Sequence, residues 1–431
     1  MTSDAWVWSY LPSDTQPTLC GHFVHANTPA GLPLGRFVYG KRFLKNPDAL
    51  PLDPLQLRLS PRTYETTALQ GVFGPLQDAM PDDWGRHVIE RLHGGRLPIT
   101  AYLLLARDDR TGNLVFSSSA GEQPQCESFP GIEVLEPARG VLRGIELDRP
   151  IDEQLAHWVQ PNTAMGGARP KLTIEHEGSL WMAKFPARND HGLAVAKLEG
   201  AMLALARLCG IQTVQAQVVA QDILLVKRFD RARVHTPGSQ AAAAAWRRDA
   251  FVSARTVFYA DPAVQGTAET GSYPRLATEL ARCSEAVTQD RHELFRRMVF
   301  NCCVSNTDDH DRNHGLLAGD EPGYYRLSPA FDIVPRVHQT RRRYQALGIG
   351  DAGALVTREN LVSSCESFDL RPRDATAIID QVQATVATNW RACLQEQGAT
   401  GEEMDALSAC FAPLIEDIEV GDFGRPTAGQ A

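Results

Sequence analysis

The stretch that decides the fold is SNTDDHDRNHG, residues 305–315, which follows directly on the apolar run MVFNCCV. Three aspartates, two histidines and two asparagines fall within its eleven positions. Because carboxylates without partners are costly to bury, this loop is either exposed to solvent or holds a cation. Two cationic occupants fit the residue types: a metal ion bound by the histidines, or a nucleotide–magnesium complex bound by the acids and an asparagine.

The spacing of the polar residues favours the nucleotide–magnesium complex. Asp308 and Asn313 are spaced as D-x-x-x-x-N, and Asp332 follows 19 residues later in LSPAFDIVP. Phosphoryl transfer uses an acid that accepts the hydroxyl proton, an amide oxygen on the metal, and a second acid between metal and phosphates. Upstream, Lys184 in LWMAKFP can reach phosphates, and Glu199, on the amphipathic helix that follows, can pair with this lysine.

Two further segments fit the same chemistry. The glycine pair of GGARPK (166–171) offers backbone N–H groups to phosphates. The segment LLVKRFD (224–230) is typical of a strand that leads into a hinge between two lobes and contacts adenine.

The hydrophobic pattern changes along the chain from strand-like to helical, which predicts an α+β, protein-kinase-like fold of two lobes. We expect five segments followed by a short tail. They are a β-rich N-terminal subdomain with one helix over MPDDWGRHVIERL (1–116), an irregular linker (117–150), a small-lobe-like region (151–230), an exposed insertion (231–250), a mainly helical catalytic lobe (251–420) and a disordered tail (421–431). In the small lobe we expect a hairpin over KLTIEHEGSLWMAKFP, a helix over LAVAKLEGAMLALARLCGI that ends at Gly210, and two more strands.

From its composition we expect a cytoplasmic chain that binds neither membranes nor, by itself, nucleic acid. Its net charge of −9 argues against direct nucleic-acid binding, which needs a basic face. No apolar run approaches the ~20 residues of a membrane span, and the start MTSDAWVWSYL lacks the pattern of a signal peptide. The nine cysteines show no C-x-x-C spacing and are expected to be buried thiols, with the adjacent Cys302 and Cys303 in the core.

The motifs resemble those of a known family. MPDDWGRHVIERL, GGARPK, MAKFP, KRFDR, FNCCVSNTDDHDRNHG and LSPAFDIVP occur in the order found in the HipA-like serine/threonine kinases of bacterial toxin–antitoxin systems, and the resemblance spans nearly the whole chain. It implies that Asp308 is the catalytic proton acceptor and that Asn313 and Asp332 bind magnesium. It also implies that a further set lines the ATP site: Gly166, Gly167, Ala168, Arg169, Pro170, Lys171, Lys184, Lys227, Arg228, Phe229, His310 and Phe331.

The same resemblance implies a function and partners. The expected activity is an ATP- and magnesium-dependent protein serine/threonine kinase that acts as a growth-inhibiting toxin on a translation-related protein, such as an aminoacyl-tRNA synthetase. The expected partner is a small dimeric DNA-binding antitoxin, which would supply the basic surface that this chain lacks. One position departs from the family: Ala164 stands where a regulatory serine is usual, and Thr163 is the nearest hydroxyl. Control by the partner is therefore expected, in preference to self-inactivation at Thr163.

Two alternative functions belong to other classes of protein. His310 and His314 are spaced as H-x-x-x-H, which would suit a metal-dependent hydrolase. A non-catalytic, pseudokinase-like binding protein would keep the fold without the chemistry, although intact Asp308, Asn313 and Asp332 argue against it. The DFG at residues 422–424 lies in the tail, so Asp422 is not expected to bind the metal.

Overall fold

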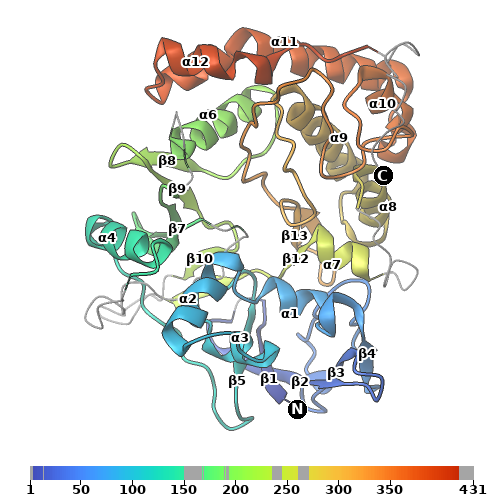
Figure 1. Ribbon diagram of the computed structural model, residues 1–431. Helices are drawn as coiled ribbons and strands as arrows, with labels where there is room; N and C mark the ends of the chain where they lie inside the picture. Colours follow the sequence, from blue (N-terminus) through green and yellow to red (C-terminus); the bar gives the residue numbers. More distant parts are fainter. Residues whose placement is uncertain are drawn as a thin grey trace, which may run out of the picture.

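The computed structural model describes residues 3–12, 14–149, 167, 169–188, 190, 194–234, 245–260 and 271–416. Figure 1 shows an N-terminal sheet with its helices at the bottom of the view, a second sheet at the left, and a group of helices at the top and right. Among the described residues, no helix has both the length and the apolar character needed to cross a membrane.

The N-terminal sheet is antiparallel and buries one face under three helices. Its strands lie in the order β4-β3-β2-β1-β5: β1 (Ser3–Tyr10), β2 (Pro17–Asn27), β3 (Pro33–Tyr39), β4 (Tyr64–Thr66) and β5 (Leu114–Ser117). The helices are α1 (Gly74–Asp78), α2 (Asp83–His93) and α3 (Ile99–Leu105). Alternate strand residues such as Val7, Phe23 and Phe37 share a core with helix residues such as Leu76 and Leu103.

The second sheet has four antiparallel strands and is buried on both faces. Its order is β6-β7-β9-β8: β6 (Lys171–His176), β7 (Ser179–Lys184), β8 (Ala216–Val219) and β9 (Ile223–Lys227). Helix α4 (Leu135–Glu146) and α2 cover one face, where Ile174, Trp181 and Leu225 are buried. Helix α6 (Val195–Leu208) covers the other, where Met182 and Leu224 are buried. The two-residue period of the strands therefore gives this sheet two separate cores.

The C-terminal half is mainly helical. Its helices are α7 (Ala254–Tyr259), α8 (Tyr273–Cys283), α9 (Val287–Cys303), α10 (Arg358–Ser363), α11 (Pro372–Glu396) and α12 (Gly401–Leu407). A small sheet of β12 (Phe251–Ser253), β13 (Gly315–Ala318) and β14 (Tyr325–Leu327) lies beside them. Helix α11 packs against both α6 and α9 and so joins the second sheet to the helical half (Figure 1).

Short 3₁₀ helices connect these elements: η1 (Phe43–Lys45), η2 (Ala68–Gln70), η3 (Ile132–Val134), η5 (Cys365–Phe368) and η6 (Ser408–Phe411). The predicted elements of the small lobe are present: the hairpin β6–β7, the helix α6, and strands β8 and β9. Gly210 follows α6 with a φ of 79°, a conformation that glycine adopts without strain.

Three local expectations were wrong. The stretch 117–150 is not merely irregular, because it contains α4, whose Leu135, Ala138 and Leu142 lie on one face at helical spacing and pack on the second sheet. The N-terminal subdomain has three α-helices where one was expected, since α1 and α3 are too short to show a clear period. The domain limits themselves remain a prediction, and the predicted tail lies outside the described residues.

The third correction concerns 231–250. Its two ends pair as the antiparallel strands β10 (Arg231–Val234) and β11 (Ala245–Arg248), and Arg231 and Arg248 are both buried. Charged residues suggested an exposed insertion, but each guanidinium has a carboxylate partner in the interior. The alanine-rich centre, 235–244, lies outside the described residues.

Candidate active site

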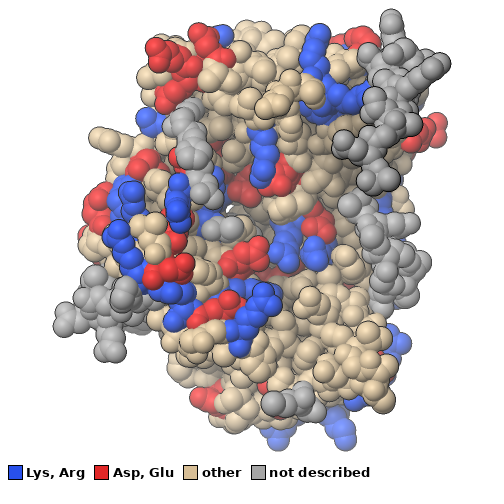
Figure 2. All heavy atoms as spheres, viewed as in Figure 1, with Lys and Arg blue, Asp and Glu red and all other residues tan. Residues whose placement is uncertain are grey.

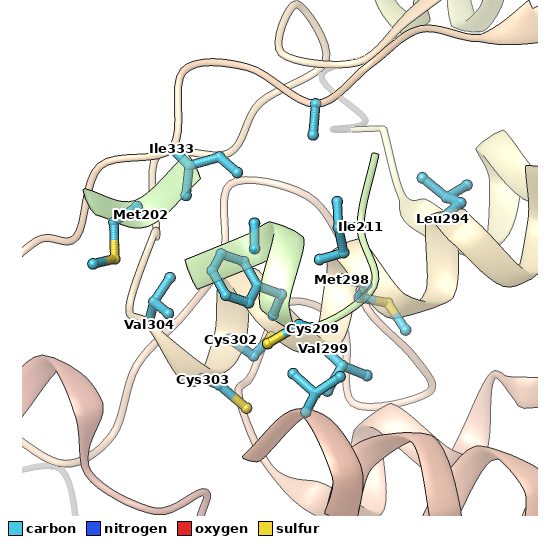
Figure 3. Packing of buried hydrophobic residues seen from close by; sticks show 14 of the residues in the cluster. Met202, Cys209, Ile211, Leu294, Met298, Val299, Cys302, Cys303, Val304 and Ile333 are labelled. Atoms are coloured by element: carbon cyan, nitrogen blue, oxygen red, sulfur yellow. The ribbon is translucent and has the colours of Figure 1, made fainter. Parts of the chain in front are cut away.

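The aspartate-rich loop is anchored by the core at its start. Helix α9 ends at Cys303, and Ser305, in the left-handed region with a φ of 58°, turns the chain away from the helix. Figure 3 shows Cys302, Cys303 and Val304 packed in the same apolar cluster as Ile333, the neighbour of Asp332. The loop and the later aspartate are therefore held by adjoining parts of one core.

The three aspartates of the loop differ in environment. Asp308 is 54% exposed, and its carboxylate accepts a hydrogen bond from Arg336 at 2.5 Å. Asn313 is buried, and its side-chain N–H₂ group lies 3.4 Å from the backbone oxygen of Asp308. An exposed carboxylate next to a buried amide fits the expected pair of proton acceptor and metal ligand.

Asp309 is instead a structural anchor. Its buried carboxylate accepts hydrogen bonds from the Tyr273 hydroxyl, from the Asn301 amide at 2.8 Å and from the His314 ring at 2.8 Å. Burial and the neighbouring carboxylate raise the pKa of Tyr273 well above its ordinary value, so the phenol stays a donor. These bonds fix the backbone on which Asp308 and Asn313 are carried.

The metal-hydrolase alternative does not fit this geometry. His314 is buried against Asp309, whereas the Nδ1 of His310 accepts a hydrogen bond from the backbone N–H of Arg312 at 3.3 Å. Within the part of the chain that the structure describes, no group of three His, Cys, Asp or Glu side chains is placed to hold a metal ion. The two histidines do not form a pair of ligands because the chain is no longer helical beyond Cys303.

Lys184 lies at the centre of the second cluster. From the end of β7 its ammonium donates to both carboxylate oxygens of Glu199 at 2.8 and 2.9 Å, and to Asp332 at 2.7 Å. Lys184 and Glu199 are buried, and the Asp332 side chain is 30% exposed. Lys184 and Asp332, 148 positions apart in the sequence, thus belong to one ion-pair triad. A lysine held in this way is suited to bind phosphate groups.

The electrostatics of the triad favour the charged forms of Lys184 and Asp332, whereas burial raises the pKa of Glu199 above its ordinary value despite the neighbouring ammonium. Burial lowers the pKa of Lys184, but the Asp332 and Glu199 carboxylates outweigh it and raise that pKa above its ordinary value. Burial would raise the pKa of Asp332, but the Lys184 ammonium, helped by Lys171 and His310, holds it below its ordinary value. An ionised carboxylate at a partly open position is the ligand that a divalent cation requires.

Several predicted ATP-lining residues lie close to this triad. Lys171 and His310 are near enough to Asp332 to lower its pKa. The rings of Phe229 and Phe331 are 5.7 Å apart and tilted by 31°, and Phe331 directly precedes Asp332. These contacts place apolar and cationic groups side by side, as a nucleotide base and its phosphates would need.

Other residues predicted to line the ATP site interact with neighbouring groups of the protein. The Lys171 ammonium is buried in an ion pair with Asp82, the N-cap of α2. Arg169 pairs with Asp190 at 2.7 Å, and the backbone oxygen of Pro170 accepts from Phe185 at 2.9 Å. Lys227 is in β9 opposite Trp181, and Gly167 has a φ of 115°. Thr163, Ala164, Gly166 and Ala168 lie outside the described residues.

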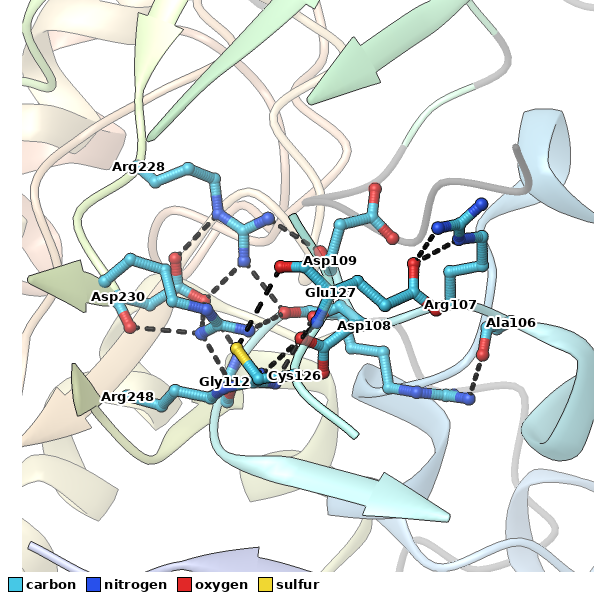
Figure 4. A network of polar contacts seen from close by, with 12 residues as sticks. Ala106, Arg107, Asp108, Asp109, Gly112, Cys126, Glu127, Arg228, Asp230 and Arg248 are labelled. Atoms are coloured by element: carbon cyan, nitrogen blue, oxygen red, sulfur yellow. Dashed lines mark hydrogen bonds and ion pairs between the residues drawn. The ribbon is translucent and has the colours of Figure 1, made fainter. Parts of the chain in front are cut away.

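Arg228 does not face the triad, contrary to the expectation. Its guanidinium is buried and binds Asp230 at 2.8 and 2.7 Å and the backbone oxygens of Asp109 and Arg110 at 2.6 and 2.8 Å. Figure 4 shows this network, in which Arg228, Asp230 and Arg248 meet the chain segment at 106–112. The KRFDR motif therefore ties the second sheet to the N-terminal subdomain, because Arg228, Asp230 and Arg231 all form hydrogen bonds with the backbone of residues 109–112.

Figure 2 shows basic and acidic side chains gathered around a hollow in the middle of the face seen in Figure 1.

Three features of the site were not predicted from the sequence: the Arg336 contact with Asp308, the anchoring of Asp309, and the Asp230 network. Only the last has a sequence signal, the dense charge of DDR (108–110) and KRFDR in otherwise apolar surroundings.

Fold and site define a kinase-like α+β protein in which Asp332 of the lysine–glutamate–aspartate triad lies near His310 of the D-x-x-x-x-N loop. The HipA-like C-terminal domain matches residues 163–390, more than half of the chain, and the chain belongs to this family. In a solved structure of the Shewanella oneidensis MR-1 HipA, HipB and operator DNA complex, one chain matches with a TM-score of 0.60 at 16% identity, over 93% of this chain and 95% of that chain. This likeness confirms the fold predicted from the sequence.

Two weaker similarities were found. A protein of Sinorhizobium fredii named "Putative kinase Y4dM" is 27% identical over a match 243 residues long, which covers 48% of this chain. The match spans about half the length (53%) of that curated relative. The Helicobacter pylori proinflammatory kinase CtkA matches with a TM-score of 0.37 at 11% identity, over 59% of this chain and 94% of that chain, which is too low to establish a shared fold.

Proposed function

We propose that this chain is an ATP- and magnesium-dependent protein serine/threonine kinase that acts as the toxin of a toxin–antitoxin pair. The observation that supports this most directly is the triad, in which Lys184 joins Glu199 to Asp332. Exposed ion pairs are common and contribute little to stability. Lys184 is instead buried between two carboxylates near the D-x-x-x-x-N loop, an arrangement that phosphoryl transfer requires.

Each residue has a role in this proposal. Bound ATP supplies the phosphoryl group, and the magnesium ion supplies positive charge against its oxygens. Lys184, which Glu199 keeps in place, would neutralise phosphate charge, and the side-chain oxygens of Asp332 and Asn313 would hold the metal. Asp308 accepts the proton of the substrate hydroxyl as the oxygen bonds to phosphorus and the bond to ADP breaks.

Partner and substrate follow from the family and are proposed on that basis. The HipA chain that this fold matches was solved with HipB and operator DNA. A small DNA-binding antitoxin is therefore the proposed partner, and its basic surface would complement a chain of net charge −9. The proposed substrate is a translation-related protein such as an aminoacyl-tRNA synthetase.

Asp332→Asn is expected to weaken magnesium-dependent ATP binding by about 10-fold or more, because a neutral amide loses most of its attraction for the metal. Calorimetric titration with ATP, with and without magnesium, measures this effect. Asp380→Asn, which removes an ion pair between the exposed Asp380 of α11 and Arg358 of α10, is the matched control and should bind like wild type. Unchanged affinity in Asp332→Asn would remove Asp332 from the metal site.

A second expectation concerns regulation. With Ala164 in place of a serine, we expect the chain incubated with magnesium–ATP to gain no stoichiometric phosphate at Thr163, because a β-branched side chain is stiff and less readily presented to the site. Mass spectrometry of the incubated protein locates any phosphate. Full occupancy at Thr163, with a loss of activity that Thr163→Ala prevents, would contradict control by a partner alone.

A further inference from the structure

A basic segment follows the triad aspartate. The nine residues RVHQTRRRY (336–344), here called the basic strip, contain four arginines and no acidic residue, in a chain of net charge −9. Arg336 and Arg341 are exposed, Arg342 is half-buried, and Arg343 is buried. A concentration of positive charge on one short exposed segment attracts anionic groups.

The basic strip is fastened to the aspartate-rich loop at both ends. The backbone N–H of Arg336 donates to the Ser305 oxygen at 2.9 Å, and the Arg343 guanidinium donates to the Ser305 hydroxyl. Between these points the Thr307 hydroxyl and the His338 ring are hydrogen-bonded at 3.1 Å. Since Ser305 and Thr307 lie three positions and one position before Asp308, the exposed part of the strip is held beside the proposed proton acceptor.

The strip also presents apolar surface. Val337 is 60% exposed and Tyr344 is 56% exposed, which makes them two of the few large hydrophobic side chains that stand open in the described structure. Exposed aromatic and aliphatic groups next to arginines are typical of protein-binding surfaces. A protein chain that carries acidic and apolar side chains would complement both features.

Arg336 has the geometry of a residue that changes partners. Its guanidinium lies 2.5 Å from the Asp308 carboxylate, and the two side chains are 58% and 54% exposed. Exposed ion pairs are weak, about 0–1 kcal/mol, so an incoming anion can replace Asp308 as the partner. The acceptor hydroxyl must come within about 3.2 Å of Asp308. Because an extended chain advances about 3.3–3.6 Å per residue, the anion that pairs with Arg336 would lie only one to three residues from the acceptor residue along the substrate.

We propose that the basic strip binds an acidic segment of the protein substrate and that Arg336 contacts an anionic side chain close to the acceptor hydroxyl. The contact selects the substrate and at the same time releases Asp308 to accept the proton. This inference rests on the proposed kinase function. The anionic group is a carboxylate or a phosphate already present on the substrate, and both would form charge-assisted hydrogen bonds with a guanidinium.

The test compares wild type with Arg336→Gln and Arg336→Glu on serine peptides that carry Asp, Asn, Lys or phosphoserine at each position near the acceptor. Wild type should phosphorylate the best Asp or phosphoserine peptide with a kcat/KM about 10-fold or more above that of its Asn counterpart. Arg336→Gln should lose this preference, mainly through KM, and Arg336→Glu should prefer Lys. The ratio of Asp to phosphoserine peptides identifies the source of the anion.

The matched control is Arg371→Gln, which removes another exposed ion pair, with Asp374 at 2.7 Å, at the start of α11. It should keep the wild-type preference. A preference for anionic peptides that persists in Arg336→Gln, or that is absent in wild type, would overturn the proposal.

A binding measurement separates this inference from the proposed function. Fluorescence anisotropy of the labelled peptides, without nucleotide, should show tighter binding of the anionic peptide to wild type and equal binding of both peptides to Arg336→Gln. The difference should shrink as salt is added. If no peptide is phosphorylated but this pattern is seen, the kinase proposal fails and the binding surface stands; equal binding to wild type refutes the surface.

Discussion

Asp308→Asn is expected to lower the kcat of peptide phosphorylation by about 10²–10⁴-fold, the usual contribution of a positioned proton acceptor. An amide of the same shape cannot take up the hydroxyl proton, whereas Lys184, Asn313 and Asp332 remain in place to bind magnesium–ATP. We therefore expect nucleotide affinity to change little. Steady-state kinetics and calorimetric titration of the same preparation measure the two effects separately.

The substitution Asp308→Asn should change activity with little effect on the stability of the fold. Because Asp308 and Arg336 are both more than half exposed, breaking their pair should change the free energy of unfolding by no more than about 1 kcal/mol. Asp311→Asn is the matched control, since Asp311 belongs to the same loop but pairs with Arg255 at 3.6 Å. It should retain most of the activity. Full activity in Asp308→Asn would assign the proton to another group.

The second large effect concerns stability. Asp230→Asn is expected to lower the free energy of unfolding by about 3–5 kcal/mol, because it leaves buried guanidinium groups without their counter-charge. The Asp230 side chain is completely buried and accepts hydrogen bonds from Arg228, from Arg231 at 2.9 Å and from the backbone N–H of Gly112 at 2.8 Å. Urea unfolding followed by circular dichroism measures the loss.

Asp222→Asn is the control for this prediction. Asp222 pairs with Arg139 at 2.7 Å, but both side chains are about one-third exposed, so we expect a loss of no more than about 1 kcal/mol. Equal losses in the two variants would show that the Asp230 network is not a special contributor to stability.

The pH dependence provides a second signature. Burial would raise the pKa of Asp230, but Arg228 and Arg231 outweigh it and hold that pKa well below its ordinary value. The unfolded chain therefore takes up the proton first as pH falls, so the Asp230 contribution is present above about pH 4 and is lost at lower pH. The difference in stability between wild type and Asp230→Asn should shrink below about pH 4. Asp109 belongs to the same network and has a pKa raised to about 6 by burial, so its contribution to stability has the opposite sign and changes at higher pH than that of Asp230.

The sequence by itself determined the elements with strong local periods and the order of the chemical motifs. The helix α6, the hairpin β6–β7 and the loop after α9 were all predicted, because apolar spacing, a glycine turn and a polar run after a core segment are local signals. The pairing of Lys184 with Glu199 was predicted from a spacing of 15 residues across one strand and one helix.

Only the tertiary structure decided which members of each motif face the site. Asp308, Asp309 and Asp311 are alike in the sequence, yet Asp309 is anchored in the core by Tyr273 and His314 while Asp308 stays exposed. Arg228 was expected at the nucleotide site, but it lies just beyond β9, and its guanidinium is held by Asp230 and by a backbone oxygen 118 residues away. Such choices depend on long-range partners, and burying a charge is favourable only where the folded chain brings a counter-charge or hydrogen-bond acceptor to meet it.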